Sequence, residues 1–146
     1  MRRRPLLAVC LLALAAGSVL AQPTPVGLWK TIDDETKAER SLIRISEAPG
    51  GALSGRVERI LEADKASARC EKCSDERKGQ PVLGMTLIRN AQPDAAHELW
   101  EGGDILDPAN GKVYRLRLKP LDGGKRLEVR GYIGPFFRSQ QWLRVE

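Results

Sequence analysis

The sequence is poor in the residues that catalytic and metal sites most often use. Its 146 residues include three cysteines and one histidine, His97. A Ser-His-acid triad would have to use His97, and no G-x-S-x-G motif accompanies it. A zinc site needs four ligands, and the chain has no second C-x-x-C motif. Gly123-Gly124 belongs to a hairpin rather than to a phosphate-binding loop, so we expect no catalytic residues, no metal and no cofactor.

Long hydrophobic runs are also absent, except at the N-terminus. Three arginines precede an apolar run from Leu6 to Ala16, and small residues at Val19 and Ala21 match a signal-peptidase site. The run is too short to span a bilayer as a permanent helix. We therefore expect residues 1–21 to be a signal peptide cut after Ala21. The mature domain, 22–146, would be periplasmic or secreted and would have no integral membrane span.

Without residues 1–21, the chain has no strong excess of either positive or negative charge. The full chain carries 24 basic and 19 acidic residues, a net charge of +5. Removing Arg2, Arg3 and Arg4 leaves 21 basic against 19 acidic residues, and the charges are interspersed. Nucleic acid as a partner loses its main support.

What the sequence does contain is a series of short segments in which apolar and polar residues alternate. Turn signals such as Asn110-Gly111 and Asp122-Gly123 separate several of them. The pattern predicts eight strands at 26–33, 39–47, 52–61, 83–91, 97–105, 112–119, 125–133 and 138–146. Sequential hairpins imply an all-β, up-and-down antiparallel topology. We expect an eight-stranded closed barrel, with an open sandwich of the same strands as the alternative.

Cys70 and Cys73 lie in the one long interruption of this pattern, between residues 62 and 81. A C-x-x-C pair acts as a redox centre when a helix N-terminus stabilises one thiolate, and no βαβ pattern surrounds this pair. In an oxidising compartment a short structural disulfide is the interpretation we favour. A labile dithiol and half of a metal site remain alternatives.

Two acidic clusters suggest turn chemistry rather than a cation site. The first is Asp33-Asp34-Glu35, and the second comprises Glu101, Asp104 and Asp107. An EF-type calcium loop needs more oxygen ligands and a terminal Glu at a fixed spacing. Carboxylates in turns usually accept hydrogen bonds from nearby backbone N–H groups.

The aromatic residues are few but are distributed over five of the expected strands. If their faces converge, they either fill the barrel core or line a ligand cavity. Two arginines could meet an anionic headgroup or pack over tryptophan. The candidates for ligand binding or for plugging the barrel are Trp29, Trp100, Tyr114, Arg130, Tyr132, Arg138 and Trp142.

Several motifs resemble a known family. Gly27-x-Trp29 with Arg138 and Trp142 resembles the lipocalin-like signature, in which a first-strand tryptophan plugs the barrel base and a last-strand arginine packs over it. The ordered motifs GLWKTIDD (27–34), CEKC (70–73), GM (84–85), WEGGDILDPANGKVY (100–114), LEVRGYIG (127–134) and RSQQW (138–142) resemble the secreted bacterial family catalogued as domain of unknown function 2147. The resemblance implies an exported lipocalin-like barrel and no established activity.

Three hypotheses of function follow. The first is a non-enzymatic binder of a small apolar or amphipathic ligand. The second is a cell-envelope interaction module with a filled barrel and a protein partner that contacts its outer face or the 62–83 segment. The third is a dithiol redox protein, which requires an exposed Cys70 of low pKa.

Overall fold

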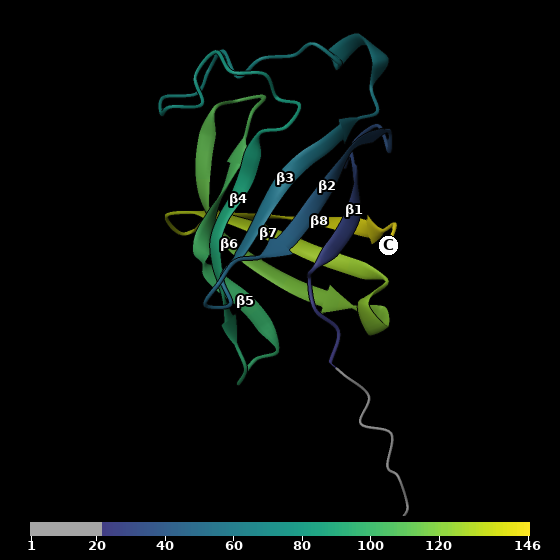
Figure 1. Ribbon diagram of the computed structural model, residues 1–146, viewed down its shortest axis with the longest axis vertical. Helices are drawn as coiled ribbons and strands as arrows, with labels where there is room; N and C mark the ends of the chain where they lie inside the picture. Colours follow the sequence, from purple (N-terminus) through teal and green to yellow (C-terminus); the bar gives the residue numbers. More distant parts are fainter. Residues whose placement is uncertain (1–21) are drawn as a thin grey trace, which may run out of the picture.

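Eight antiparallel strands follow one another along the chain in a computed structural model that describes residues 22–146 (Figure 1). The strands are β1 (Gly27–Ile32), β2 (Glu39–Glu47), β3 (Leu53–Ile60), β4 (Thr86–Asp94), β5 (Leu99–Asp107), β6 (Lys112–Leu121), β7 (Arg126–Ile133) and β8 (Phe136–Arg144). Two single-turn 3-10 helices, η1 (Ala63–Lys65) and η2 (Asp122–Gly124), lie in the connections. The expected signal peptide lies outside the described residues.

The sheet closes on itself. Each strand pairs with its neighbours in chain order, and β1 also pairs with β8 through Trp29↔Arg144 and Lys30↔Leu143. The expected eight-stranded barrel is confirmed, and the open sandwich is wrong. Closure satisfies the backbone groups that an open sheet would expose at its edges.

Up-and-down topology gives the barrel two different ends. The connections 33–38, 61–85, 108–111 and 134–135 meet at one end, which we call the open end (Figure 1). The connections 48–52, 95–98 and 122–125 meet at the other, which we call the closed end, together with the segment before β1 and the C-terminus. The longest connection, 61–85, therefore belongs to the open end.

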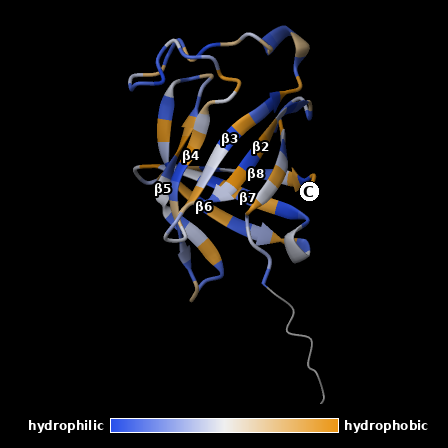
Figure 2. Ribbon diagram, viewed as in Figure 1, coloured by the Kyte–Doolittle hydropathy of each residue, from blue (hydrophilic) through white to orange (hydrophobic). Residues whose placement is uncertain are grey.

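Alternation of apolar and polar residues places the core inside the barrel (Figure 2). Trp29, Leu118, Leu127 and Trp142 are buried and fill its closed half. Because successive residues of a strand point to opposite faces, one apolar residue in two suffices to build this core. Within the described residues, no helix is long and apolar enough to cross a membrane.

Three strands start two or three residues away from their predicted positions. β4 starts at Thr86 rather than at residue 83. The backbone N–H of Gly84 and the carbonyl of Met85 form hydrogen bonds with Val57 just before the strand begins. β5 runs from Leu99 rather than 97, since Glu98 has a φ of 54° that belongs to a turn. β8 starts at Phe136 rather than 138, immediately after the Gly134-Pro135 turn.

Candidate functional site

The closed end is sealed by a tryptophan and an arginine. The Trp29 indole N–H donates to the carbonyl of Pro25 at 2.7 Å, and the Arg144 guanidinium lies 4.2 Å from the Trp29 ring centroid. Arg144 also donates to the carbonyls of Thr24, Val26 and Gly124 at 2.5–2.9 Å. Burial lowers the pKa of Arg144 from its ordinary value. The arginine over the tryptophan is therefore Arg144, and the expectation that it would be Arg138 is wrong.

Polar side chains also line the interior of the barrel. The Trp142 indole N–H donates to Oε1 of Gln140 at 3.2 Å, and the hydroxyls of Thr31 and Ser41 lie 2.8 Å apart. Gln140, Thr31 and Ser41 all line one interior chamber. They supply polar groups to the wall of a chamber that also has apolar and charged lining residues.

That chamber is a cavity of about 730 Å³ that opens at the open end. All eight strands contribute to its wall, since the side chains that point inward alternate along every strand. Its apolar lining includes Ile43, Val57, Ile60, Val82, Leu87, Ile105, Leu106 and Val129. The barrel is therefore filled in its closed half and hollow in its open half.

The rim of the cavity is charged. Asp33 forms an ion pair with Arg40 and accepts hydrogen bonds from the backbone and hydroxyl of Thr36 at 2.7 and 2.9 Å. The backbone hydrogen bond from Thr36 is the main reason that the pKa of Asp33 falls to about 2. Asp33 thus stays ionised at neutral pH and holds the β1–β2 turn in place.

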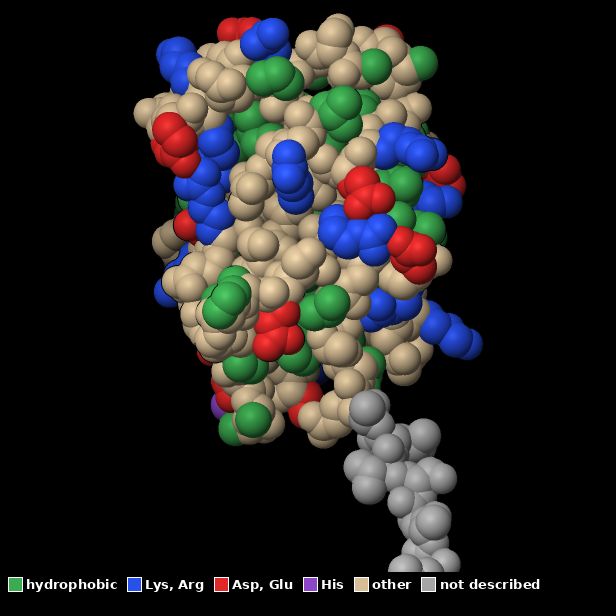
Figure 3. All heavy atoms as spheres, in the orientation of Figure 1, with side chains coloured by type: hydrophobic (Ala, Val, Ile, Leu, Met, Phe, Trp, Pro, Cys, Tyr) green, Lys and Arg blue, Asp and Glu red, His purple; other side chains and the backbone are tan. Residues whose placement is uncertain are grey.

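Cations and anions are balanced around this rim. Arg138 pairs with Asp34 at 2.9 Å, and this hydrogen bond raises the pKa of Arg138. The charged lining comprises Arg40, Lys65, Arg69, Lys72 and Arg138 against Asp33, Glu35, Glu62, Glu71 and Asp107. Figure 3 likewise shows basic and acidic side chains interspersed on one face of the molecule. A rim of this kind suits a polar or zwitterionic group better than a strongly charged one.

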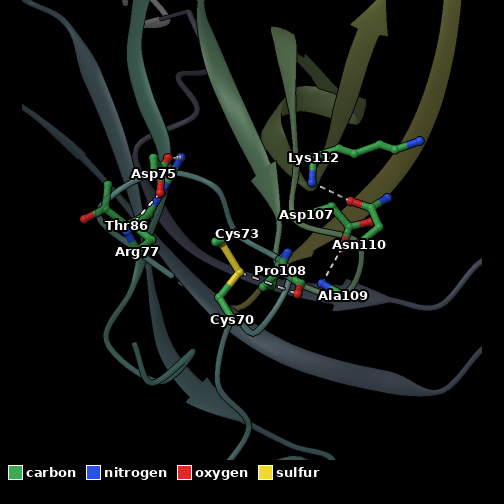
Figure 4. Close-up of a disulfide and its surroundings, with 10 residues drawn as sticks. All are labelled: Cys70, Cys73, Asp75, Arg77, Thr86, Asp107, Pro108, Ala109, Asn110 and Lys112. Atoms are coloured by element: carbon green, nitrogen blue, oxygen red, sulfur yellow. Dashed lines mark hydrogen bonds and ion pairs between the residues drawn. A yellow bond between two sulfur atoms is a disulfide. The ribbon is translucent and has the colours of Figure 1, made fainter. Parts of the chain in front are cut away.

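The 62–83 segment covers one side of the cavity and is braced by a disulfide (Figure 4). Cys70 and Cys73 are bonded to each other, with Cα atoms 5.4 Å apart, and both are buried. The structural disulfide is confirmed. A redox centre with an exposed Cys70 finds no support in this arrangement, because a buried disulfide is shielded from attacking thiols.

Arg77 fastens the same segment to the barrel wall. Its guanidinium is almost fully buried, donates to Oδ2 of Asp75 at 2.6 Å, and also donates to the backbone carbonyl of Thr86 in β4 at 2.9 Å (Figure 4). Hydrogen bonds from Arg77 lower the pKa of Asp75 to about 2. Because the charge of Arg77 is buried, removing either Arg77 or its partner Asp75 would be costly to stability.

The disulfide turn also packs tightly on the β5–β6 turn. A Cβ on Gly111 would lie 2.0 Å from the carbonyl oxygen of Lys72, and Gly111 has a φ of +72°. Sγ of Cys70 lies 3.7 Å from the carbonyl oxygen of Pro108. Only glycine fits at 111. Asn110-Gly111 therefore forms a hairpin turn and also the surface on which the 62–83 segment packs.

Asp107, one residue of the acidic cluster on β5, serves the local backbone. Asp107 accepts a hydrogen bond from the backbone N–H of Ala109 at 2.9 Å, and its own carbonyl accepts one from Gly111 (Figure 4). Within residues 22–146, no group of three or more His, Cys, Asp or Glu side chains could hold a metal ion.

The seven candidate residues lie in four places. Trp29 and Trp142 form the plug, and Trp100 packs against the core without lining the cavity. Tyr114 and Arg138 line the cavity.

Arg130 and Tyr132 lie on the outer face of the barrel instead. They alternate along β7 with Val129 and Gly131, which line the cavity. Arg130 donates to Ser139 at 2.7 Å, and its guanidinium lies 4.5 Å from the Phe137 ring centroid. The structure therefore does not bring Arg130 and Tyr132 to the cavity.

Sequence reasoning missed three residues that shape this site: Gln140, Arg144 and Arg77. Gln140 and Arg144 flank Trp142 at a spacing of two, so strand periodicity alone places them on the inner face. Arg77 carries no comparable signal, because the 62–83 segment follows no period.

Comparisons with known proteins agree with this architecture. Residues 27–144 match the model of a family described as "Uncharacterized protein conserved in bacteria (DUF2147)". The chain is also similar to the solved structure titled "Protein HP1028 from the human pathogen Helicobacter pylori belongs to the lipocalin family". That likeness has a TM-score of 0.71 at 15% identity and covers 85% of this chain and 84% of the other.

The likeness to HP1028 is one of fold, because identity is low. A comparison with curated proteins finds no match. The family match extends from the first residue of β1 to the last residue of β8. The chain belongs to the DUF2147 family of uncharacterised bacterial proteins, built here on a lipocalin-like barrel.

Proposed function

We propose that this protein binds a small amphipathic molecule in the open half of its barrel and performs no chemistry on it. The observation that carries the proposal is the cavity of about 730 Å³. Pockets for small ligands typically measure about 300–1,000 Å³ and combine apolar walls with a few polar groups. Here apolar side chains and the polar Gln140 and Thr31 form the walls, and charged residues surround the mouth.

The mixed rim favours a ligand with an apolar body and a polar or zwitterionic head. The apolar body would displace water from the walls near Leu87, Ile105 and Val129. The head would remain among the paired charges at the mouth, where it avoids the cost of burying an unpaired polar group. The alternative of an interaction module with a filled barrel loses its premise, because the open half is hollow.

We further propose that the protein acts in the periplasm or outside the cell after cleavage between Ala21 and Gln22. The basic start and short apolar run of the chain support this location. Mass spectrometry of protein from osmotic-shock fluid should find Gln22 at the N-terminus. A retained Met1 would contradict it.

Fluorescence titration with N-phenyl-1-naphthylamine, an apolar dye, tests the cavity directly. We expect saturable binding to the mature protein. Val129→Trp should reduce the affinity at least tenfold, because the indole would occupy the cavity that Val129 lines.

Val113→Trp is the matched control, since Val113 is an exposed residue on the outer face of the neighbouring strand β6. It should bind the dye as the unaltered protein does. Near-UV circular dichroism checks that both variants keep the fold. Equal binding by the two folded variants, or no binding by the unaltered protein, would refute the cavity proposal.

A further inference from the structure

The uncharged polar side chains of the cavity wall differ in which of their donors and acceptors are already used. The lining residues of this kind are Thr31, Ser41, Asn110, Tyr114 and Gln140. The hydroxyls of Thr31 and Ser41 lie 2.8 Å apart and serve each other. The hydrogen bonds of the other three show which groups remain for a ligand.

The amide of Gln140 is held in one orientation by the plug. An indole N–H can only donate, so the Trp142 N–H must face Oε1 of Gln140, which lies 3.2 Å away. Nε2 of Gln140 therefore points away from Trp142, and within residues 22–146 it has no hydrogen-bond partner. It is also accessible, since the buried side-chain atoms without a partner in that range are Oδ1 of Asp104 and Nε of Arg117. Gln140 thus presents an unused donor to the cavity that it lines.

The hydroxyl of Tyr114 is fixed as a donor in a similar way. The backbone N–H of Lys112 donates to Oδ1 of Asn110 at 2.8 Å (Figure 4). The amide nitrogen of Asn110 is therefore the group that faces the Tyr114 hydroxyl, at 2.9 Å, and it donates to that oxygen. The proton of the hydroxyl itself has no acceptor in the described part of the chain. Tyr114 thus supplies a second unused donor.

Both donors border the same stretch of β7. Gln140 pairs with Val129 across the β7–β8 hairpin. Tyr114 packs over Gly131, where an added Cβ would lie 3.0 Å from Cβ of Tyr114. Val129 and Gly131 are successive inward residues of β7, and both line the cavity. A ligand that lies along this wall therefore meets unused donors from β6 and from β8.

We propose that the ligand presents an uncharged carbonyl oxygen, as in an ester or an amide, to Gln140 and Tyr114; this assignment rests on the proposed function. A carbonyl oxygen accepts and does not donate, so it complements both groups. A carboxylate fits less well, because Arg138 on the same face of β8 already pairs with Asp34, and a buried charge needs a partner. Gln140 and Tyr114 then determine specificity, while the apolar walls hold the rest of the ligand.

Competition against N-phenyl-1-naphthylamine, a dye without oxygen atoms, tests the assignment. Methyl laurate should displace the dye from the mature protein. Gln140→Met and Tyr114→Phe remove one donor each and nearly keep the side-chain shape. Each should weaken methyl laurate binding about tenfold and leave the dye affinity unchanged. Laurate, which is ionised at neutral pH, should bind more weakly than its methyl ester.

Matched controls make the same changes on the outer face. Gln141→Met lies beside Gln140 on the opposite face of β8, and Tyr132→Phe lies on the outer face of β7. Both should bind methyl laurate as the unaltered protein does. Gln140→Glu is a second variant at the site, because it keeps an acceptor for the Trp142 N–H and removes the donor. It should also lose ester binding, which a residue that only supports the plug would not.

Three outcomes would overturn the carbonyl assignment: unchanged ester affinity in Gln140→Glu and Tyr114→Phe, equal losses in the outer-face controls, or tighter binding of laurate than of its methyl ester. Dye binding separates this failure from failure of the cavity proposal. No dye binding by the unaltered protein refutes the cavity itself. Dye binding with unchanged ester affinities in the variants refutes the carbonyl assignment alone.

Discussion

The same eight strands form a filled closed end and a hollow open end in one barrel. At the closed end, Trp29 and Trp142 are buried, and Arg144 covers the plug while donating hydrogen bonds to backbone carbonyls. At the open end, Tyr114 and its neighbours surround a cavity, and a disulfide-braced segment covers one side. The difference shows that side-chain volume, rather than strand geometry, decides where an eight-stranded barrel is solid and where it is hollow.

The largest expected effect on stability comes from a substitution at the closed end. Trp29→Ala should lower the free energy of unfolding by about 3–5 kcal/mol, because a fully buried indole leaves a cavity that the core cannot fill. Tyr114→Ala should cost only about 1–2 kcal/mol, because it enlarges a space that is already open. Urea unfolding of both variants measures the difference. Equal losses would mean that the two ends are packed alike.

The next effect concerns the covering segment. Cys70→Ser/Cys73→Ser should lower the free energy of unfolding by about 2 kcal/mol, the loop-closure entropy of so short a loop. Hydrogen exchange should quicken in residues 62–83 and leave β1 and β8 protected, because the disulfide lies at the open end. Exchange that quickens evenly throughout the barrel would contradict a local role for the disulfide.

The smallest effect is a pH dependence of the open end. Hydrogen bonds from Thr36 hold the pKa of Asp33 at about 2, below its ordinary value of 3.8. A lowered pKa stabilises the fold above the ordinary pKa, and that contribution is lost as the pH falls from about 4 to about 2. Asp33→Asn should therefore flatten the loss of stability over this interval, as measured by urea unfolding at each pH.

Asp75 provides the control for that measurement. Its pKa is also lowered to about 2, chiefly by Arg77, so the Asp33→Asn variant should keep part of the pH dependence. An Asp33→Asn variant with the same pH dependence as the unaltered protein would show that the β1–β2 turn makes no contribution.

Much of the barrel could be predicted from local pattern. Alternation located the strands, and Asn110-Gly111 and Asp122-Gly123 marked two of the hairpins. Strand ends were less accurate, as at Glu98, because its positive φ has no signal in apolar periodicity. The C-x-x-C spacing was compatible with a short disulfide, and the structure shows that bond buried against the β5–β6 turn.

The arginine that covers Trp29 could not be chosen from the sequence. Arg138 and Arg144 lie on the same face of β8 as Trp142, four residues before it and two after it. Periodicity treats the two alike, but they lie at opposite ends of the barrel. Closure of the sheet pairs Trp29 with Arg144 and leaves Arg138 beside Asp34 at the rim.

The sequence by itself determined which residues of each strand point inward and which turns join neighbouring strands, because both depend on the local backbone. Tertiary structure alone decided that the closed half is filled, that the open half is hollow, and that the 62–83 segment covers one side of the cavity. Those features depend on the volumes of side chains that meet only when β1 pairs with β8. No local sequence pattern reports the total volume of the side chains inside the barrel, because these side chains come from eight separate strands.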